Sequence, residues 1–173
     1  FWRHNSFLSA TVRHDELQTV ASRLPSNLHT DSFEEQQEIE GLWSSYKEHG
    51  YGHFFYWLTR VLKPTLGVEI GVLQGFSLLS VASALRDNGS GVVHGFDLFE
   101  DYPYHHDDYA NVLQRIKSLG LTTWATASRG DAFQVHEKFD TVDYLHVDIS
   151  NNGDVFRQVF QQWSPKVKKV ILL

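Results

Sequence analysis

The chain has 173 residues, of which 42% are hydrophobic and 14% aromatic, and this composition suits one globular domain with a sizeable core. Its net charge of −6 and lack of a long basic run argue against nucleic acid as the main partner. Without cysteine it can form neither disulfides nor thiolate metal sites. No apolar stretch reaches about 18 residues and no signal-peptide pattern is present, so we expect a cytoplasmic protein with no membrane partner.

The N-terminal part of the chain, residues 1–63, predicts a helical lid or extension. A short candidate helix covers residues 15–24. Ser32 and Glu35 have the spacing of a capping box, which predicts a second helix through about Glu48.

A third helix is predicted over residues 53–62, after a break at Gly50 and Gly52. Its expected apolar face consists of Phe54, Leu58, Val61 and Leu62. His53 could belong to a lid over a binding site, although core packing explains the aromatic residues around it more simply.

Beyond this extension, residues 64–173 alternate between strand and helix patterns. Five strands are predicted, at residues 66–70, 92–96, 122–127, 142–147 and 167–173. Helices are predicted between them, at residues 76–86, 108–119, 132–137 and 154–163. The alternation predicts an α/β fold with a doubly wound, Rossmann-like parallel sheet in the order 3-2-1-4-5, and strands six and seven are not evident. Ligands of such sheets bind beyond the carboxyl ends of the strands. The expected site therefore comprises residues 71–75, 97–107, 128–131 and 148–153.

The strongest local signal is the run Val68-Glu69-Ile70-Gly71-Val72-Leu73-Gln74-Gly75, in which a strand passes through a glycine turn into a helix. Gly71 permits a tight turn, and Gly75 lets a cofactor approach the backbone at the start of the helix. Leu73 stands where the dinucleotide fingerprint has its middle glycine, which disfavours a nicotinamide dehydrogenase. An ordinary glycine turn without a ligand remains the alternative.

The second predicted strand ends in Gly95-Phe96-Asp97. An acid about 20 residues beyond the glycine turn can accept hydrogen bonds from both ribose hydroxyls of a nucleoside. Asp97 stands near that place, and a solvated loop acid is the alternative.

These features resemble the class I S-adenosylmethionine (SAM)-dependent methyltransferases. More narrowly, Val93-His94-Gly95-Phe96-Asp97-Leu98-Phe99-Glu100-Asp101-Tyr102-Pro103 looks like a stretch of the macrocin O-methyltransferase family. The resemblance covers about residues 60–173. It implies that Glu69 and Gly71 hold the methionine end of SAM and that Asp97 binds its ribose. Leu98 would line the adenine ring, and Asp131 would face the adenine amino group.

The resemblance also points to Asp148, at the end of the fourth predicted strand, as the catalytic residue. The corresponding family acid is a metal ligand or lies beside the reacting centre, so Asp148 is expected as a general base or as a ligand of Mg²⁺. Ile149 and Ser150 replace the usual glycine and second acid. An acid stabilised at a helix N-terminus is the structural alternative.

Histidine is abundant in the chain. His146 lies on the same side of its predicted strand as Asp148, and we interpret it as a hydrogen-bonded core residue rather than a base. His105 and His106 could be a base or metal ligands, but an exposed loop explains them more simply.

The sequence therefore predicts an enzyme that uses SAM, with Mg²⁺ as a candidate second cofactor, to methylate a hydroxyl of a small molecule or sugar. A non-catalytic Rossmann-like module that binds a cofactor or a partner is the alternative. The sequence leaves open whether the protein forms a homo-oligomer.

Overall fold

In the computed structural model, residues 38–39, 41–46, 51–103, 107–150 and 152–173 are described. Within them, parallel strands form one sheet in the order β3-β2-β1-β4-β5. These strands are β1 (Leu66–Ile70), β2 (Val92–Asp97), β3 (Ala125–Arg129), β4 (Val142–Val147) and β5 (Val167–Leu172). The predicted fold class and strand order are confirmed.

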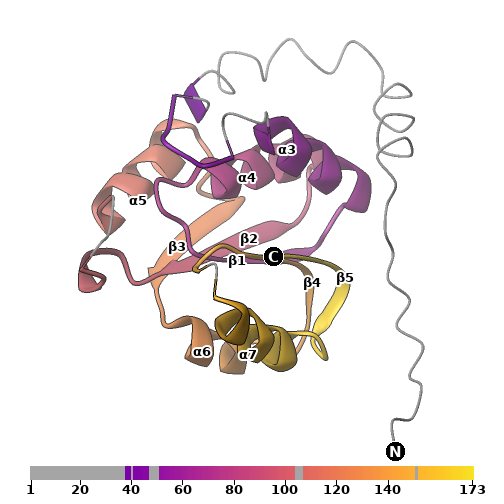
Figure 1. Cartoon of the computed structure of the whole chain (residues 1–173). Coiled ribbons are helices and arrows are strands. Elements are labelled where there is room, and N and C mark those ends of the chain that lie inside the picture. Colours follow the sequence, from indigo (N-terminus) through magenta and orange to yellow (C-terminus); the bar gives the residue numbers. More distant parts are fainter. Residues whose placement is uncertain (1–37, 40, 47–50, 104–106, 151) are drawn as a thin grey trace, which may run out of the picture.

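Helices cover both faces of the sheet (Figure 1). One face carries α3 (Tyr51–Leu62), α4 (Phe76–Asn88) and α5 (Tyr109–Ser118), and the other carries α6 (Ala132–Val135) and α7 (Gly153–Trp163). Two short 3₁₀ helices follow β2 and α6, at η3 (Phe99–Asp101) and η4 (His136–Lys138). None of the helices in the described ranges is both long and apolar enough to cross a membrane.

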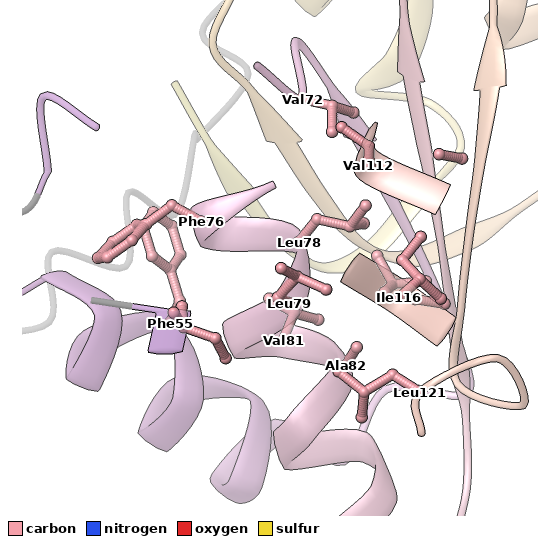
Figure 2. Packing of buried hydrophobic residues seen from close by; sticks show 14 of the residues in the cluster. Phe55, Val72, Phe76, Leu78, Leu79, Val81, Ala82, Val112, Ile116 and Leu121 are labelled. Atoms are coloured by element: carbon pink, nitrogen blue, oxygen red, sulfur yellow. The ribbon is translucent and has the colours of Figure 1, made fainter. Parts of the chain in front are cut away.

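Each face of the sheet has its own hydrophobic core. On the α3–α5 side, Phe55 of α3 lies against Phe76 at the start of α4, and Val112 and Ile116 of α5 complete the cluster (Figure 2). On the α6–α7 side, the largest fully buried side chain is Trp163. Because β4 is covered on both faces, all six of its residues are buried.

The start of α3 differs from the sequence prediction. Gly52 was expected to break a helix, but it lies in the first turn of α3 and is buried. A Cβ at Gly52 would stand 3.0 Å from Cζ of Phe76, so the glycine lets α3 approach α4 closely. The predicted apolar face is wrong at Val61, which is exposed, whereas Phe54 and Leu58 are partly buried against the core. The buried positions of α3 are instead Gly52, Phe55, Tyr56 and Thr59.

The helix predicted to reach Glu48 is wrong at residues 41–46. Residues 38–39 are helical, but residues 41–46 consist of turns and irregular backbone. Gly41 weakens a helix at this point. The N–H of Trp43 bonds the side-chain oxygen Oε1 of Gln74 at 2.7 Å, so a tertiary contact takes the donor that a helix would have used. The candidate helix at residues 15–24 and the capping box lie outside the described residues.

The third strand begins later than predicted, at Ala125 rather than at residue 122. The N–H of Trp124 bonds the carbonyl of Leu121 at 2.8 Å, and this turn takes up the expected start of the strand. Similarly, the helix predicted at residues 132–137 is divided into α6 and η4. The other predicted strands and helices after residue 64 differ from the structure by at most two residues at either end.

Candidate active site

A cavity of about 510 Å³ lies at the carboxyl ends of β1, β2, β3 and β4. Its volume is typical of a site for a small molecule or cofactor. All four loops predicted to form the site contribute to its walls, together with the ends of the strands and helices beside them. The lining residues are Ile70, Gly71, Leu73, Phe96, Asp97, Leu98, Phe99, Tyr102, Asp107, Gly130, Asp131, Ala132, Phe133, Asp148, Ile149, Ser150 and Val155.

The cavity brings together most of the predicted site residues, which come from four separate loops. Those in its lining are Gly71, Asp97, Leu98, Asp131 and Asp148. Glu69 and Gly75 lie outside the lining. Gly75 is the N-cap of α4, and Glu69 is fully buried beneath the turn.

Gly71 closes the turn between β1 and the cavity at a point where a side chain has no room. Its φ is +89°, and a Cβ there would stand 2.1 Å from the carbonyl oxygen of Asp148. Its N–H bonds the carbonyl of Phe96 at 2.8 Å, and the N–H of Asp148 bonds the carbonyl of Ile70 at 2.8 Å. These bonds join the ends of β2 and β4 to β1, so the loops that carry Asp97 and Asp148 open into the same cavity.

Leu73 has a left-handed backbone, with φ of +52°, although it is not a glycine. Such a conformation is uncommon for residues with a branched apolar side chain and is found where the surroundings enforce it. Leu73 lines the cavity. Its residue type gives no sequence signal for this conformation, so the strained backbone could not be predicted.

Asp97 ties the end of β2 to the turn after β1. Its Oδ2 accepts the N–H groups of Val72 at 2.7 Å and Leu73 at 3.1 Å, and its Oδ1 accepts the N–H of Phe99 at 2.9 Å. Because three backbone N–H groups bond its carboxylate, Asp97 is not a freely solvated loop acid. Each carboxylate oxygen can accept about two hydrogen bonds, so Oδ1 keeps capacity for a further donor.

Asp131 caps the short helix α6 on another wall of the cavity. Its Oδ1 accepts the N–H of Phe133 at 2.8 Å. The aromatic side chain of Phe133 and the exposed side chain of Leu98 also line the cavity. This part of the site thus combines a fixed carboxylate with apolar groups that suit a planar ring.

Asp148 stands at the end of β4 and is exposed to the cavity. It is not a helix cap, because the N-cap of α7 is Asn152, whose side chain accepts the N–H of Asp154 at 2.9 Å. The structural alternative for Asp148 is therefore wrong.

The expectation of Mg²⁺ at Asp148 is not supported by its surroundings. Hard cations bind several oxygen ligands. Among the described residues, no group of three or more His, Asp or Glu side chains could hold a metal ion. The residues beside Asp148 in the cavity wall are Ile149 and Ser150, which supply no second carboxylate.

Asp107 lines the cavity and forms an ion pair with Arg115. Burial by itself would raise the pKa of Asp107, but hydrogen bonds from Asn111 and Arg115 outweigh it and lower the pKa. Arg115 also donates to the carbonyl of Gln74 at 3.2 Å. Arg115, in the last turn of α5, thereby links the segment before this helix to the turn after β1. His105 and His106, which precede Asp107, lie outside the described residues.

A buried polar chain beneath the cavity includes a residue that the sequence prediction missed. His146 is 2% exposed, and its Nδ1 lies 3.2 Å from Oε2 of Glu69 while its Nε2 lies 3.2 Å from the hydroxyl of Tyr46. This agrees with the interpretation of His146 as a hydrogen-bonded core residue. Tyr46 stands 100 positions away in the sequence, in an irregular segment, so no local pattern could identify it. His53 is exposed on α3 and does not line the cavity.

The environment of Tyr46 favours its protonated form. Burial raises the pKa of its hydroxyl, and hydrogen bonding to Asp148 and repulsion by the carboxylates of Asp148 and Glu69 raise it further. Tyr46 is thus a hydrogen-bond donor throughout the physiological pH range.

The chain is similar to known methyltransferases in sequence. A family model described as a methyltransferase domain matches residues 68–172, more than half of the chain. Among curated proteins, none matches the sequence.

Solved methyltransferase structures share the fold. An S-adenosylhomocysteine (SAH)-bound methyltransferase from Podospora anserina has a TM-score of 0.63 at 16% identity, with 99% of this chain and 70% of that chain covered. The O-methyltransferase TomG from Streptomyces achromogenes, involved in tomaymycin synthesis and complexed with SAM, has a TM-score of 0.59 at 15% identity, with 90% and 68% covered. An O-methyltransferase from Bacillus cereus in complex with SAH has a TM-score of 0.55 at 19% identity, with 84% and 66% covered.

The match to the family begins within β1 and ends with β5, so it covers all four loops around the cavity. The expected relation to methyltransferases is confirmed, while the narrower likeness to the macrocin O-methyltransferases stays a prediction. The chain belongs to the methyltransferase-domain family of enzymes.

Proposed function

We propose that this chain binds SAM in the cavity and transfers its methyl group to a hydroxyl of a small molecule or sugar. The observation that carries the proposal is the convergence of Gly71, Asp97, Asp131 and Asp148 on one cavity of about 510 Å³. Each comes from a different loop at the carboxyl edge of the sheet, where doubly wound folds bind nucleotides.

The nucleoside part of SAM would lie between the ends of β2 and β3. Asp97 would accept hydrogen bonds from the ribose hydroxyls, since its Oδ1 has a free acceptor position and is already oriented by Phe99. Asp131 would accept from the adenine amino group. Leu98 and Phe133 would cover the faces of the ring, because aromatic rings stack well on such apolar surfaces.

The methionine part would extend along the turn after β1. Gly71 would present its backbone to the ligand, as its place in the cavity wall supports. Glu69 lies outside that wall, and its oxygens are engaged with Ser77 and His146. We therefore propose that any influence of Glu69 on the methionine end is indirect.

The acceptor would lie beside Asp148. When bound, SAM would supply the methyl group: the hydroxyl oxygen of the acceptor would take it, and the electron pair of the broken carbon–sulfur bond would stay on sulfur to give SAH. The proton of the hydroxyl passes to the carboxylate of Asp148 and from there to solvent, as in general base catalysis. The cavity would hold the two reactants in line, and such positioning supplies much of the rate acceleration. Since the described residues do not form a metal site, no step is assigned to Mg²⁺.

The resemblance of residues 93–103 to the macrocin O-methyltransferases supports sugars as acceptors, and small phenols share the required hydroxyl. The proposal is tested by incubating the chain with SAM and a panel of sugars, phenols and catechols and measuring SAH by mass spectrometry. SAH that accumulates only with a hydroxyl acceptor, together with the methylated product, supports it. Cofactor binding without turnover on any acceptor would favour the non-catalytic alternative instead.

A further inference from the structure

A buried carboxylate and a buried imidazole face each other across the centre of the sheet. Glu69 of β1 and His146 of β4 are direct partners in the strand register and are 0% and 2% exposed. Burying a carboxylate is costly unless it is well hydrogen bonded. The hydroxyl of Ser77 donates to Oε1 of Glu69 at 2.9 Å, and Nδ1 of His146 lies 3.2 Å from Oε2. Both oxygens are therefore occupied within the protein.

The chain of polar groups continues outward through Tyr46. The hydroxyl of Tyr46 lies 3.2 Å from Nε2 of His146, and its ring makes an edge contact with Phe55, with ring centroids 5.2 Å apart. The segment that carries Tyr46 is fastened at a second point, where the N–H of Trp43 bonds Oε1 of Gln74 at 2.7 Å. Residues 41–46 are thus docked on the ends of β1 and β4, beside the cavity.

The outer end of the chain is Asp148, which stands two residues after His146 on the same side of β4. Burial raises the pKa of Tyr46 most, and the charge of the nearby Asp148 carboxylate and hydrogen bonding to it raise the pKa further. A carboxylate can only accept, so the tyrosine must donate to it, and the tyrosine oxygen is then free to accept from Nε2–H of His146. In this order of donors, the hydroxyl of Tyr46 is satisfied both as a donor and as an acceptor.

We propose that Tyr46 is a positioning residue that holds the carboxylate of Asp148 toward the reacting methyl group, with His146 and Glu69 fixing the direction of its hydroxyl. The inference rests on the proposed function of the cavity. Asp148 is exposed, so without a fixed donor its carboxylate can adopt several rotamers. Catalytic groups need such support because small displacements are costly in rate. The role also accounts for the docking of residues 41–46 beside the cavity.

The test uses sinefungin, a SAM analogue that carries a protonated amine where SAM carries its reactive methyl. Asp148 should accept a hydrogen bond from this amine, whereas SAH has no group at that place. The dissociation constants of sinefungin and SAH are measured by calorimetry for the wild type, Tyr46→Phe and Asp148→Asn. Tyr56→Phe is the matched control, because Tyr56 also donates to an aspartate, Asp87 at 2.6 Å, at the opposite end of α4.

The advantage of sinefungin is the ratio of the dissociation constant of SAH to that of sinefungin. We expect this ratio to fall about three- to tenfold in Tyr46→Phe, because a charge-assisted hydrogen bond is weakened. Asp148→Asn should remove the advantage, and Tyr56→Phe should leave it unchanged. An unchanged ratio in Tyr46→Phe would overturn the inference, and so would an unchanged ratio in Asp148→Asn. Equal weakening of both ligands by Tyr46→Phe would assign Tyr46 a purely structural role and overturn it too. If the wild type bound neither ligand, the proposed function itself would fail, and this inference with it.

Discussion

The Cα of Gly71 lies so close to Asp148 that a Cβ at this glycine would stand 2.1 Å from the carbonyl oxygen of Asp148. The end of β1 and the end of β4 thus meet without any intervening side chain. This contact sets the distance between the turn that would hold the cofactor and the loop that would hold the acceptor.

Gly71→Ala should therefore destabilise the fold through two separate effects. A left-handed alanine costs about 1–2 kcal/mol, and overpacking against a backbone carbonyl adds about 1–3 kcal/mol. The free energy of unfolding is measured in urea, with Gly89→Ala as the control. Gly89 also has a positive φ, of +69°, but a Cβ there meets nothing within 4 Å. Equal losses for the two variants would show that the close contact with Asp148 does not constrain the site.

Asp143→Asn should reduce stability in a pH-dependent way. The N–H and hydroxyl of Thr65 both donate to Oδ2 of Asp143 at 2.8 Å, and together with the nearby ammonium of Lys169 they hold the pKa of Asp143 below its ordinary value. A lowered folded-state pKa gives stability that is present above the unfolded pKa of about 3.9 and is lost as pH falls through the folded pKa.

The difference in unfolding free energy between the wild type and Asp143→Asn should thus stay constant from neutrality to about pH 5 and narrow below about pH 4. Urea denaturation across this range measures it. Asp140→Asn, at an exposed position nearby, is the control and should show little difference at any pH. A difference in unfolding free energy that widened in acid would contradict a lowered pKa for Asp143.

Asp131 is predicted to have two separable roles. Asp131→Ala should lose about 1 kcal/mol of stability through the missing N-cap of α6. Asp131→Ser keeps a capping oxygen and should restore most of that stability. Both variants should bind SAH more weakly than the wild type, but less so than variants of Asp97, because a single contact to adenine is at stake. If the serine variant bound SAH as tightly as the wild type, Asp131 would be a cap alone.

Asp148→Asn should abolish turnover while leaving the dissociation constant for SAH within about threefold, because the residue faces the acceptor rather than the nucleoside. The measurement is SAH production with whichever hydroxyl acceptor the wild type methylates. Turnover by the wild type should also persist in chelator if Asp148 acts as a base. Loss of activity in chelator would instead assign Asp148 to a metal, and near-normal turnover of the variant would exclude both roles.

Much of the fold could be predicted because the sheet is built from local patterns. The bounds of β1 and β4 are those expected from the sequence, since each is a short, buried strand between clear breaks. The glycine turn after β1 and Asp97 at the end of β2 could be predicted as site residues because they directly follow such strands. Parallel topology then placed four loops around one cavity.

The features that could not be predicted depend on contacts between distant parts of the chain. Gly52 lies in the first turn of α3, where the ring of Phe76 leaves little room for a side chain. Residues 41–46 leave the helical conformation where Trp43 bonds Gln74. Tyr46 contacts His146, from which it is separated by 100 positions. Helix propensity and hydrophobic period contain no information on such partners.

The most direct test of the central claim is the binding of SAH to the wild type and to Asp97→Asn, measured by calorimetry. Asp101→Asn, a nearby exposed acid outside the cavity wall, is the control. The account predicts one SAH per wild-type chain, a loss of about 1.5–3 kcal/mol in Asp97→Asn, which is about 10- to 150-fold in the dissociation constant, and no comparable loss in the control. A wild type that did not bind SAH, or an Asp97→Asn variant with an unchanged dissociation constant, would contradict it.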